Sequence, residues 1–244
     1  MLDQSQDAGD ASVPAQPVPT PAPTVLPSYR IWQDFRTNIT HARLRAFLGS
    51  PFFFLMLVYI FTGLGAGLFI PYFNLFFVHQ LKASSALFGL IDGGANGLTA
   101  LTTLAAPWLA IRIGRVNAIA LTRLFSIPLL LLVGLTGMLP LAALLYPLRQ
   151  GVMDMSNGVL QVYSMEAVSE KFRGVANSSY QAAYQVPWAI SASLGGLIIV
   201  QAGYPPVFVL GALCYILAIG VLWRRFGLKK GGHTLSWKLR DRIK

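Results

Sequence analysis

The stretch that decides the fold is Leu139–Gly174, LPLAALLYPLRQGVMDMSNGVLQVYSMEAVSEKFRG. Its first part is apolar enough to enter a lipid bilayer, yet it contains Arg149 and Asp154 well inside. A charge at mid-membrane costs about 2.5–3.5 kcal/mol on insertion scales, so such residues are functional candidates. Polar residues recur there at i, i+4, i+7 and i+11: Gln150, Asp154, Asn157 and Gln161. This spacing predicts a helix with one polar face along a watery cavity, and polar contacts between helices are the alternative.

Composition indicates a membrane protein. Of its 244 residues 55% are hydrophobic and 11% are charged, whereas soluble proteins carry about 25% charged residues. Most of the net charge of +10 lies outside the apolar runs, which indicates basic membrane flanks and argues against nucleic-acid binding. A single cysteine, Cys214, and three scattered histidines argue against a disulfide, a metal site or a cofactor.

Apolar runs near or above the roughly 20 residues that a bilayer requires occur six times. They predict an all-α membrane protein with a six-helix transmembrane bundle at residues 51–226. The expected spans are 52–78, 86–110, 117–136, 139–163, 175–200 and 206–223.

The flanking segments have other compositions. Residues 1–28 are rich in proline and predict a disordered linker. Residues 29–50 have an apolar face and four arginines, which predicts an interfacial amphipathic helix. Residues 227–244 form a basic tail suited to anionic lipid.

Lys and Arg are distributed very unevenly between the two sides of the predicted spans. Seventeen of the 19 fall on one side when Arg123, at the start of the third span, is counted with its flank. The opposite side has Lys82, and Arg149 lies within a span. By the positive-inside rule both termini are cytoplasmic, in a plasma (inner) membrane.

Polar stripes distinguish the spans. The third and sixth are almost purely apolar and are expected to face lipid, while the others surround a polar path, which gives a 3+3 inverted-repeat arrangement. Glycines at 63 and 67, and at 89, 93 and 97, predict close helix packing. The stripes are Tyr59, Thr62, Tyr72 and Asn74 in the first span; Asp92, Asn96, Thr99 and Thr103 in the second; and Asn177, Gln181, Tyr184, Gln185 and Trp188 in the fifth.

The loop after the second span reads PWLAIRIGR, residues 107–115. It resembles the short cytoplasmic signature of the major facilitator superfamily, with Arg112, Gly114 and Arg115 in matching places. Ile111 replaces the acidic residue of the full signature and Pro107 its first glycine. Residues 50–226 resemble the C-terminal half of such a transporter, and Met165-Glu166 with Arg173-Gly174 resembles the family's equivalent loop after the fourth span.

The resemblance implies secondary transport of a small organic solute, with or without a proton, by two six-helix bundles. Because this chain has one bundle, we expect either a fragment that lacks its N-terminal half or a half-size protein that pairs with itself or with a separate half. The alternative class is a six-helix protein that transports nothing, either an assembly partner or an oligomeric channel. An enzyme is not expected, since no His cluster, nucleophile motif or phosphate-binding loop occurs.

Several residues are candidates for roles in transport. Burial favours a protonated carboxyl group, so Asp154 and Asp92 are candidates for proton coupling, and structural hydrogen bonding is the alternative. Arg149 is about 140° around the helix from Asp154 and requires another partner, such as Asp92, a backbone carbonyl or an anionic substrate. Glu166 and Arg173 are expected to form a cytoplasmic ion pair or to be solvated. The expected substrate path comprises Tyr146, Asp154, Asn157, Gln181, Tyr184, Gln185 and Trp188.

Overall fold

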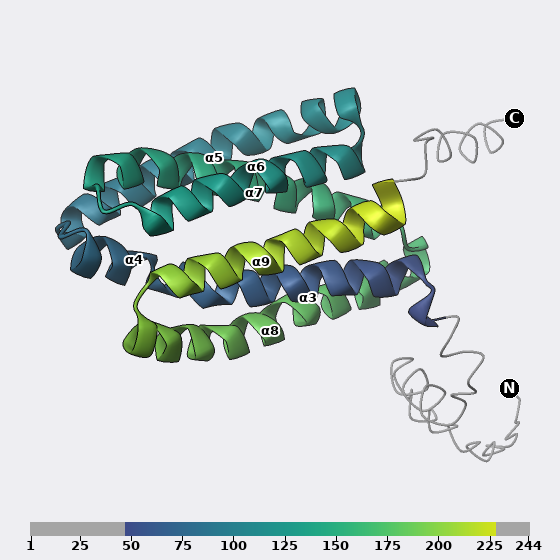
Figure 1. The fold of residues 1–244 in the computed structure, drawn as a ribbon. Helices are drawn as coiled ribbons and strands as arrows, with labels where there is room; N and C mark the ends of the chain where they lie inside the picture. The colour runs from purple at the N-terminus through teal and green to yellow at the C-terminus, as the bar shows by residue number, and fades with distance from the viewer. Residues whose placement is uncertain (1–46, 228–244) are drawn as a thin grey trace, which may run out of the picture. The chain divides into compact units, whose positions relative to one another are not determined.

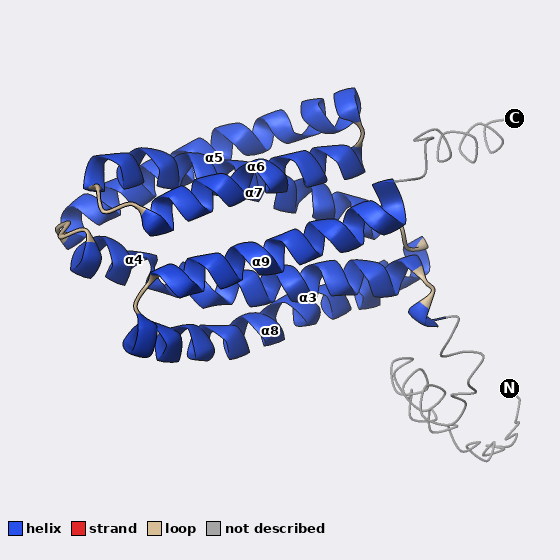
Figure 2. Ribbon diagram, in the orientation of Figure 1, coloured by secondary structure: helices blue, strands red, loops and turns tan. Residues whose placement is uncertain are grey.

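Helices form at all six positions where the sequence predicts membrane spans. The computed structural model describes residues 47–227, which belong to one unit, Arg45–Lys244. The predicted linker, most of the interfacial helix and the basic tail lie outside the described residues. Between residues 47 and 227 every regular element is a helix (Figure 2). The six principal helices are α3 (Pro51–Phe69), α5 (Ser85–Ile113), α6 (Arg115–Leu135), α7 (Leu139–Glu166), α8 (Arg173–Ala202) and α9 (Pro205–Leu222).

Local chemistry sets the helix ends. The side chain of Ser50 caps α3 by accepting a hydrogen bond from the Phe53 amide at 3.2 Å, and Ser84 caps α5 in the same way. Both supply the acceptor that the first turn of a helix lacks. Gly114, with φ 86°, separates α5 from α6, and Gly203, with φ 78°, ends α8. Glycine adopts these left-handed conformations at little cost, so a single glycine is enough to end a helix and change the direction of the chain.

The end of the first span is irregular. Beyond α3 the chain continues through η1 (Ile70–Tyr72), α4 (Phe73–Leu75) and η2 (Phe76–Gln80). Pro71 lacks an amide hydrogen and its ring crowds the preceding turn, which explains the break in regular α-helix. Two further short elements are η3 (Glu170–Phe172), before α8, and η4 (Trp223–Gly227), after α9.

Four helical segments in the described part are long and apolar enough to cross a membrane: Pro51–Gln80, Arg115–Leu135, Glu170–Ala202 and Pro205–Gly227. Helices α5 and α7 form where spans two and four are expected but do not reach the same apolarity. Both carry the polar stripes seen in the sequence, and α7 contains two charges in its interior. Their polar residues must therefore be sheltered by other helices or by water.

The helices pack in two groups of three, α5 with α7 and α6, and α3 with α8 and α9 (Figure 1). The most extensive pairs are α3 with α8 and α5 with α7, followed by α6 with α7 and α3 with α9. Exchanging α3 with α7, α5 with α8 and α6 with α9 maps these pairs onto one another. The exchange relates the first three spans, α3, α5 and α6, to the last three, α7, α8 and α9. Since consecutive spans alternate in direction, these two repeats have opposite orientations, and the 3+3 inverted-repeat prediction is confirmed.

Glycines permit the closest of these contacts. A methyl group on Gly63 would collide with the backbone carbonyl of Tyr184, and one on Gly67 with that of Trp188. On the other helix, Gly195 lies equally close to the carbonyl of Leu68. The expectation for α3 is therefore confirmed: its backbone lies directly against that of α8.

The glycines of α5 behave differently. A methyl group added at position 89, 93 or 97 would meet open space within the described residues. The expected close packing is therefore absent there, because α5 turns this small-residue face away from the other five helices.

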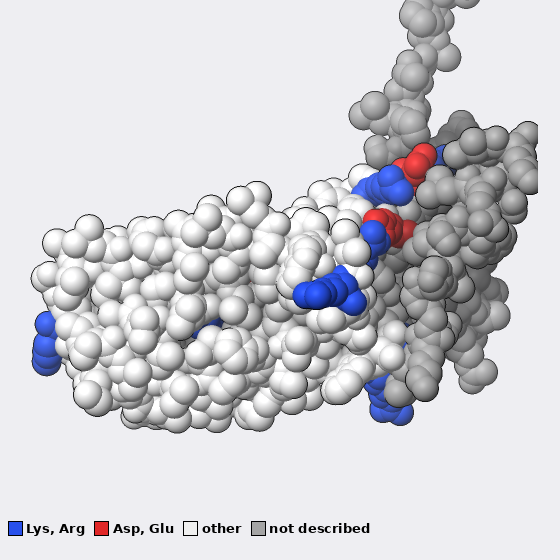
Figure 3. Space-filling view, turned by 90° about the horizontal axis from the view of Figure 1, so that it is seen from above, with Lys and Arg blue, Asp and Glu red and all other residues white. Residues whose placement is uncertain are grey.

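In Figure 3 charged side chains gather at one end of the bundle, a small blue patch marks the other end, and the long surface between them is almost wholly uncharged. Exposed leucine, isoleucine and valine side chains occur along α5, α6, α8 and α9. An apolar belt with charged ends is the surface that a bilayer requires.

Helix α6 is not uniformly apolar, which corrects the expectation for the third span. Arg123 lies in its third turn and is 1% exposed, so it does not belong to the cytoplasmic flank. The outer face of α6, with Leu124, Phe125 and Leu132, is exposed and apolar. Only one face of α6 can therefore meet lipid, because the other holds a charge inside the bundle.

Candidate functional site

Two adjoining cavities lie between α3, α7 and α8. Their volumes are about 130 Å³ and about 220 Å³, and Thr62, Asn157 and Tyr184 line both. At 1.5 Å per residue, the α7 residues of the first cavity begin roughly 15 Å from the start of a helix roughly 40 Å long. The first cavity is also lined by Ala66, Ile70, Arg149, Gln150, Met153, Asp154 and Tyr215, and the second by Tyr59, Arg123, Leu160, Gln161 and Gln181.

Arg123 connects three helices at the second cavity. Its Nη1 donates to Thr62 Oγ1 on α3 at 2.7 Å. Its Nε and Nη2 donate to Ser156 Oγ and Asn157 Oδ1 on α7 at 2.9 and 3.1 Å. A planar guanidinium can hold several acceptors in fixed directions. Arg123 therefore fixes α3 and α6 against the polar face of α7.

Asp154 extends this network to α5. Its Oδ2 accepts a hydrogen bond from Thr99 Oγ1 at 3.3 Å, and its Oδ1 accepts one from Asn157 Nδ2 at 3.4 Å. Asn157 thus lies between Asp154 and Arg123, donating to one and accepting from the other. The amide links a carboxylate to a buried cation without direct contact between the charges.

Asp92 occupies a second polar site, which Asn96 connects to Gln150 in the wall of the first cavity. Tyr146 donates to its Oδ1 at 2.6 Å, and Asn96 Nδ2 lies 3.3 Å from its Oδ2. The Tyr146 ring is buried against Phe73, with ring centroids 4.8 Å apart. Tyr146 therefore packs inside the bundle and lines neither cavity.

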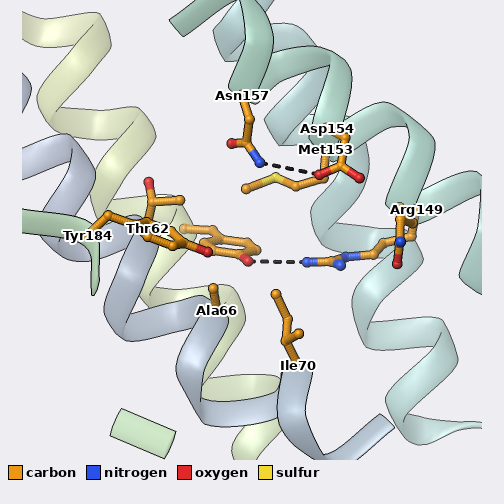
Figure 4. A pocket seen from close by; sticks show the side chains of 10 residues that line it. Thr62, Ala66, Ile70, Arg149, Met153, Asp154, Asn157 and Tyr184 are labelled. Atoms are coloured by element: carbon orange, nitrogen blue, oxygen red, sulfur yellow. Dashed lines mark hydrogen bonds between the residues drawn. The ribbon is translucent and has the colours of Figure 1, made fainter. Parts of the chain in front are cut away.

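Arg149 projects from α7 across the first cavity (Figure 4). It is 3% exposed, and its Nη2 donates to the Tyr215 hydroxyl on α9 at 3.1 Å. Asp92, one of the partners that the sequence suggests for Arg149, is bonded to Tyr146 instead.

The structure brings together part of the predicted path. Asp154, Asn157 and Tyr184 surround the first cavity (Figure 4), and Gln181 lines the second. Gln185 is exposed and Trp188 is half-buried on α8, and neither lines a cavity.

The loop between α5 and α6 bears the predicted signature. Arg112 is exposed and stacks over Trp108 at 4.9 Å, and Gly114 makes the turn between the helices. Arg115 forms an ion pair with Glu166 at the end of α7. The expected pairing of Glu166 with Arg173 is wrong, because Arg173 faces Glu170 at 3.8 Å. Both partners of the Arg115 pair are partly exposed, so solvent screens the interaction.

Three site residues were missed by the sequence pattern. Arg123 was assigned to a flank because it lies near the start of an apolar run. Ser156 lies off the polar stripe of α7, and Tyr215 is one aromatic residue in an apolar helix. The signal that could have indicated Arg123 is its position. It lies eight residues beyond Arg115 and two helical turns inside the span, where a charge is costly.

Metal-binding geometry is not found in residues 47–227, where no group of three or more His, Cys, Asp or Glu could hold an ion. The polar groups around the two cavities are instead amides, hydroxyls, two guanidiniums and one carboxylate. Such a set can bind polar groups of an organic molecule by hydrogen bonds.

Comparison with known proteins gives a family match over most of the chain. Residues 55–239 match the family described as Major Facilitator Superfamily. Among curated proteins, none matches the sequence.

Proposed function

Because the chain belongs to the Major Facilitator Superfamily, a family of membrane transporters, we propose that its six helices are one half of a secondary transporter for a small organic solute. The observation that carries this proposal is the pair of polar cavities at mid-depth in an otherwise apolar bundle. Transporters built from inverted repeats bind their substrates near the middle of the membrane. Asp154, Asn157, Gln181 and Tyr184 form the path, and Gln185 and Trp188 continue it along α8.

A second six-helix bundle completes the path, either a separate N-terminal half or another copy of this chain. Gln181 and Gln185 are exposed on α8, and the small-residue face of α5 is free within the described helices. Exposed amides at membrane depth are costly in lipid, so a protein or water-filled surface must face them. Alternating access then consists of rocking one bundle against the other.

The proposed orientation places both termini on the cytoplasmic side of a plasma (inner) membrane. It rests on the distribution of Lys and Arg, with Arg123 now removed from the cytoplasmic count. The remaining flanking residues still lie overwhelmingly on one side of the spans, so the positive-inside rule gives the same orientation.

Asp154 is the preferred candidate for proton coupling and Asp92 the second. Asp154 lines the cavity and faces two cations, Arg149 on α7 and Arg123 through Asn157. Asp92 is held by Tyr146 and does not line the cavities. A proton on Asp154 would change the charge directly beside the proposed path.

The test is solute flux in proteoliposomes. The full chain is purified together with any polypeptide that accompanies it and is supplied with labelled glucose, benzoate or ethidium, with and without a pH gradient. We expect saturable flux of one probe, reduced at least tenfold by Asp154→Asn, which removes the ionisable carboxyl group from the path, and by Gln181→Ala, which removes an amide. A flux indifferent to the gradient would remove the coupling role of Asp154.

The matched control is Gln201→Ala, exposed at the end of α8. It is expected to retain most of the flux. Unchanged flux in Asp154→Asn and Gln181→Ala would contradict the assigned path. Ion conductance without solute dependence would favour the oligomeric-channel alternative.

A further inference from the structure

Arg149 has more hydrogen-bonding capacity than the bundle uses. A guanidinium carries five N–H donors, and the described residues give it one hydrogen bond, to Tyr215. Its Nε is buried and has no partner among them. An unsatisfied buried donor destabilises the folded state, and more so when it is charged. The side chain is therefore in a state that a suitable acceptor would stabilise.

Neighbouring groups hold the guanidinium in place without satisfying its donors. Its Cζ lies 4.9 Å from the ring centroid of Phe69, 5.9 Å from that of Phe73 and 6.0 Å from that of Tyr215. Aromatic faces attract a cation electrostatically but leave its N–H groups free at the edge of the plane. The donor edge of Arg149 thus remains available at the cavity.

No carboxylate within the described helices lies at ion-pair distance from Arg149, since the ion pairs found there involve Arg115 and Arg173. Asp154 is on the same helix and lines the same cavity, but its hydrogen bonds go to Thr99 and Asn157. Arg123, at the adjoining cavity, already donates to three oxygen acceptors. Arg149 lines the first cavity and has the larger unused donor capacity.

We infer that Arg149 binds the carboxylate of a singly charged organic solute, an inference that rests on the proposed transport function. A carboxylate accepts two parallel hydrogen bonds from a guanidinium. The first cavity, about 130 Å³, has room for such a group, and the adjoining cavity of about 220 Å³ receives the rest of the molecule near Gln181 and Tyr184. Asp154 in the same lining disfavours a doubly charged anion.

The test uses benzoate and its neutral, similarly shaped analogue benzamide. The full chain in lipid nanodiscs is heated with increasing concentrations of each, and the apparent Tm is recorded. Benzoate is expected to raise the Tm of the wild type and benzamide to leave it unchanged, because a ligand of the folded state stabilises it. Arg149→Gln should require at least tenfold more benzoate for the same rise.

Two further variants keep the test decisive if Arg149→Gln does not fold. Arg149→Lys retains the charge without the planar fork and should bind benzoate with reduced affinity. Arg225→Gln changes an exposed arginine far from the cavity in sequence and should bind like the wild type. Equal stabilisation by benzoate and benzamide, or full benzoate binding in both Arg149 variants, would overturn the inference.

The outcomes separate the inference from the proposed function. Saturable flux of glucose or ethidium without any benzoate binding would overturn the carboxylate site and leave transport standing. Benzoate binding that depends on Arg149, in a preparation without flux of any probe, would support the site and contradict transport.

Discussion

Replacing Arg123 by Ala is expected to lower the stability of the bundle by about 3–5 kcal/mol. Arg123 is 1% exposed and donates to Thr62, Ser156 and Asn157. The substitution removes three hydrogen bonds, leaves a cavity of nearly the whole side chain and deprives Asp154 of the cation linked to it through Asn157. The measurement is the apparent Tm in detergent, expected to fall by about 10 °C for a bundle of this size.

A matched control is Arg225→Ala. Arg225 is exposed and donates one hydrogen bond, to the Gly49 carbonyl at 3.0 Å, so its loss should cost no more than about 0.5 kcal/mol. The network also predicts coupling: Asp154→Asn should cost less stability in the Arg123→Ala background than in the wild type. A Tm for Arg123→Ala within 2 °C or so of the Arg225→Ala value would contradict this assignment.

Gly63→Ala is expected to give the second large loss, about 1–3 kcal/mol. The new methyl group would overlap the backbone carbonyl of Tyr184, which cannot rotate away as a side chain can. Helices α3 and α8 would have to separate along the crossing that also holds Gly67 and Gly195. Because α8 carries Tyr184 and Gln181, the same separation should alter the cavities. Thermal unfolding of the purified chain measures the loss.

The control substitution is expected to change stability in the opposite direction. Gly220→Ala in α9 adds a methyl group where nothing lies within 4 Å. Since alanine favours a helix interior over glycine by about 0.5–1 kcal/mol, this variant should be neutral or slightly stabilised. If Gly63→Ala were as stable as Gly220→Ala, the close α3–α8 contact would be wrong.

The fold was predictable because a bilayer imposes length and apolarity on each span. Ser50, Ser84, Gly114 and Gly203 mark helix ends with residues whose local chemistry favours those positions. What sequence periodicity cannot supply is the rotation of each helix about its axis. The glycines of α5 have the same spacing as those of α3, yet only those of α3 meet a neighbouring backbone.

The site was predictable only in part for the same reason. The stripe on α7 correctly indicated the cavity wall at Asp154 and Asn157, because several polar residues on one face define a direction. Arg123 and Tyr215 are single residues in apolar helices, and a single residue defines no periodicity. Tyr146 belongs near the stripe by spacing, but a tight hydrogen bond to Asp92 and packing on Phe73 keep it in the core.

The most direct test of a water-filled polar path inside an apolar bundle is the reactivity of introduced thiols. With Cys214 replaced by Ser, single cysteines at Asn157 and Gln181 are compared with cysteines at Leu124 and Leu132, on the outer face of α6, using a charged methanethiosulfonate in nanodiscs. Thiolates form in water and not in hydrocarbon, so the first two are expected to react at least tenfold faster. Faster labelling at Leu124 and Leu132 than at Asn157 and Gln181 would contradict the account.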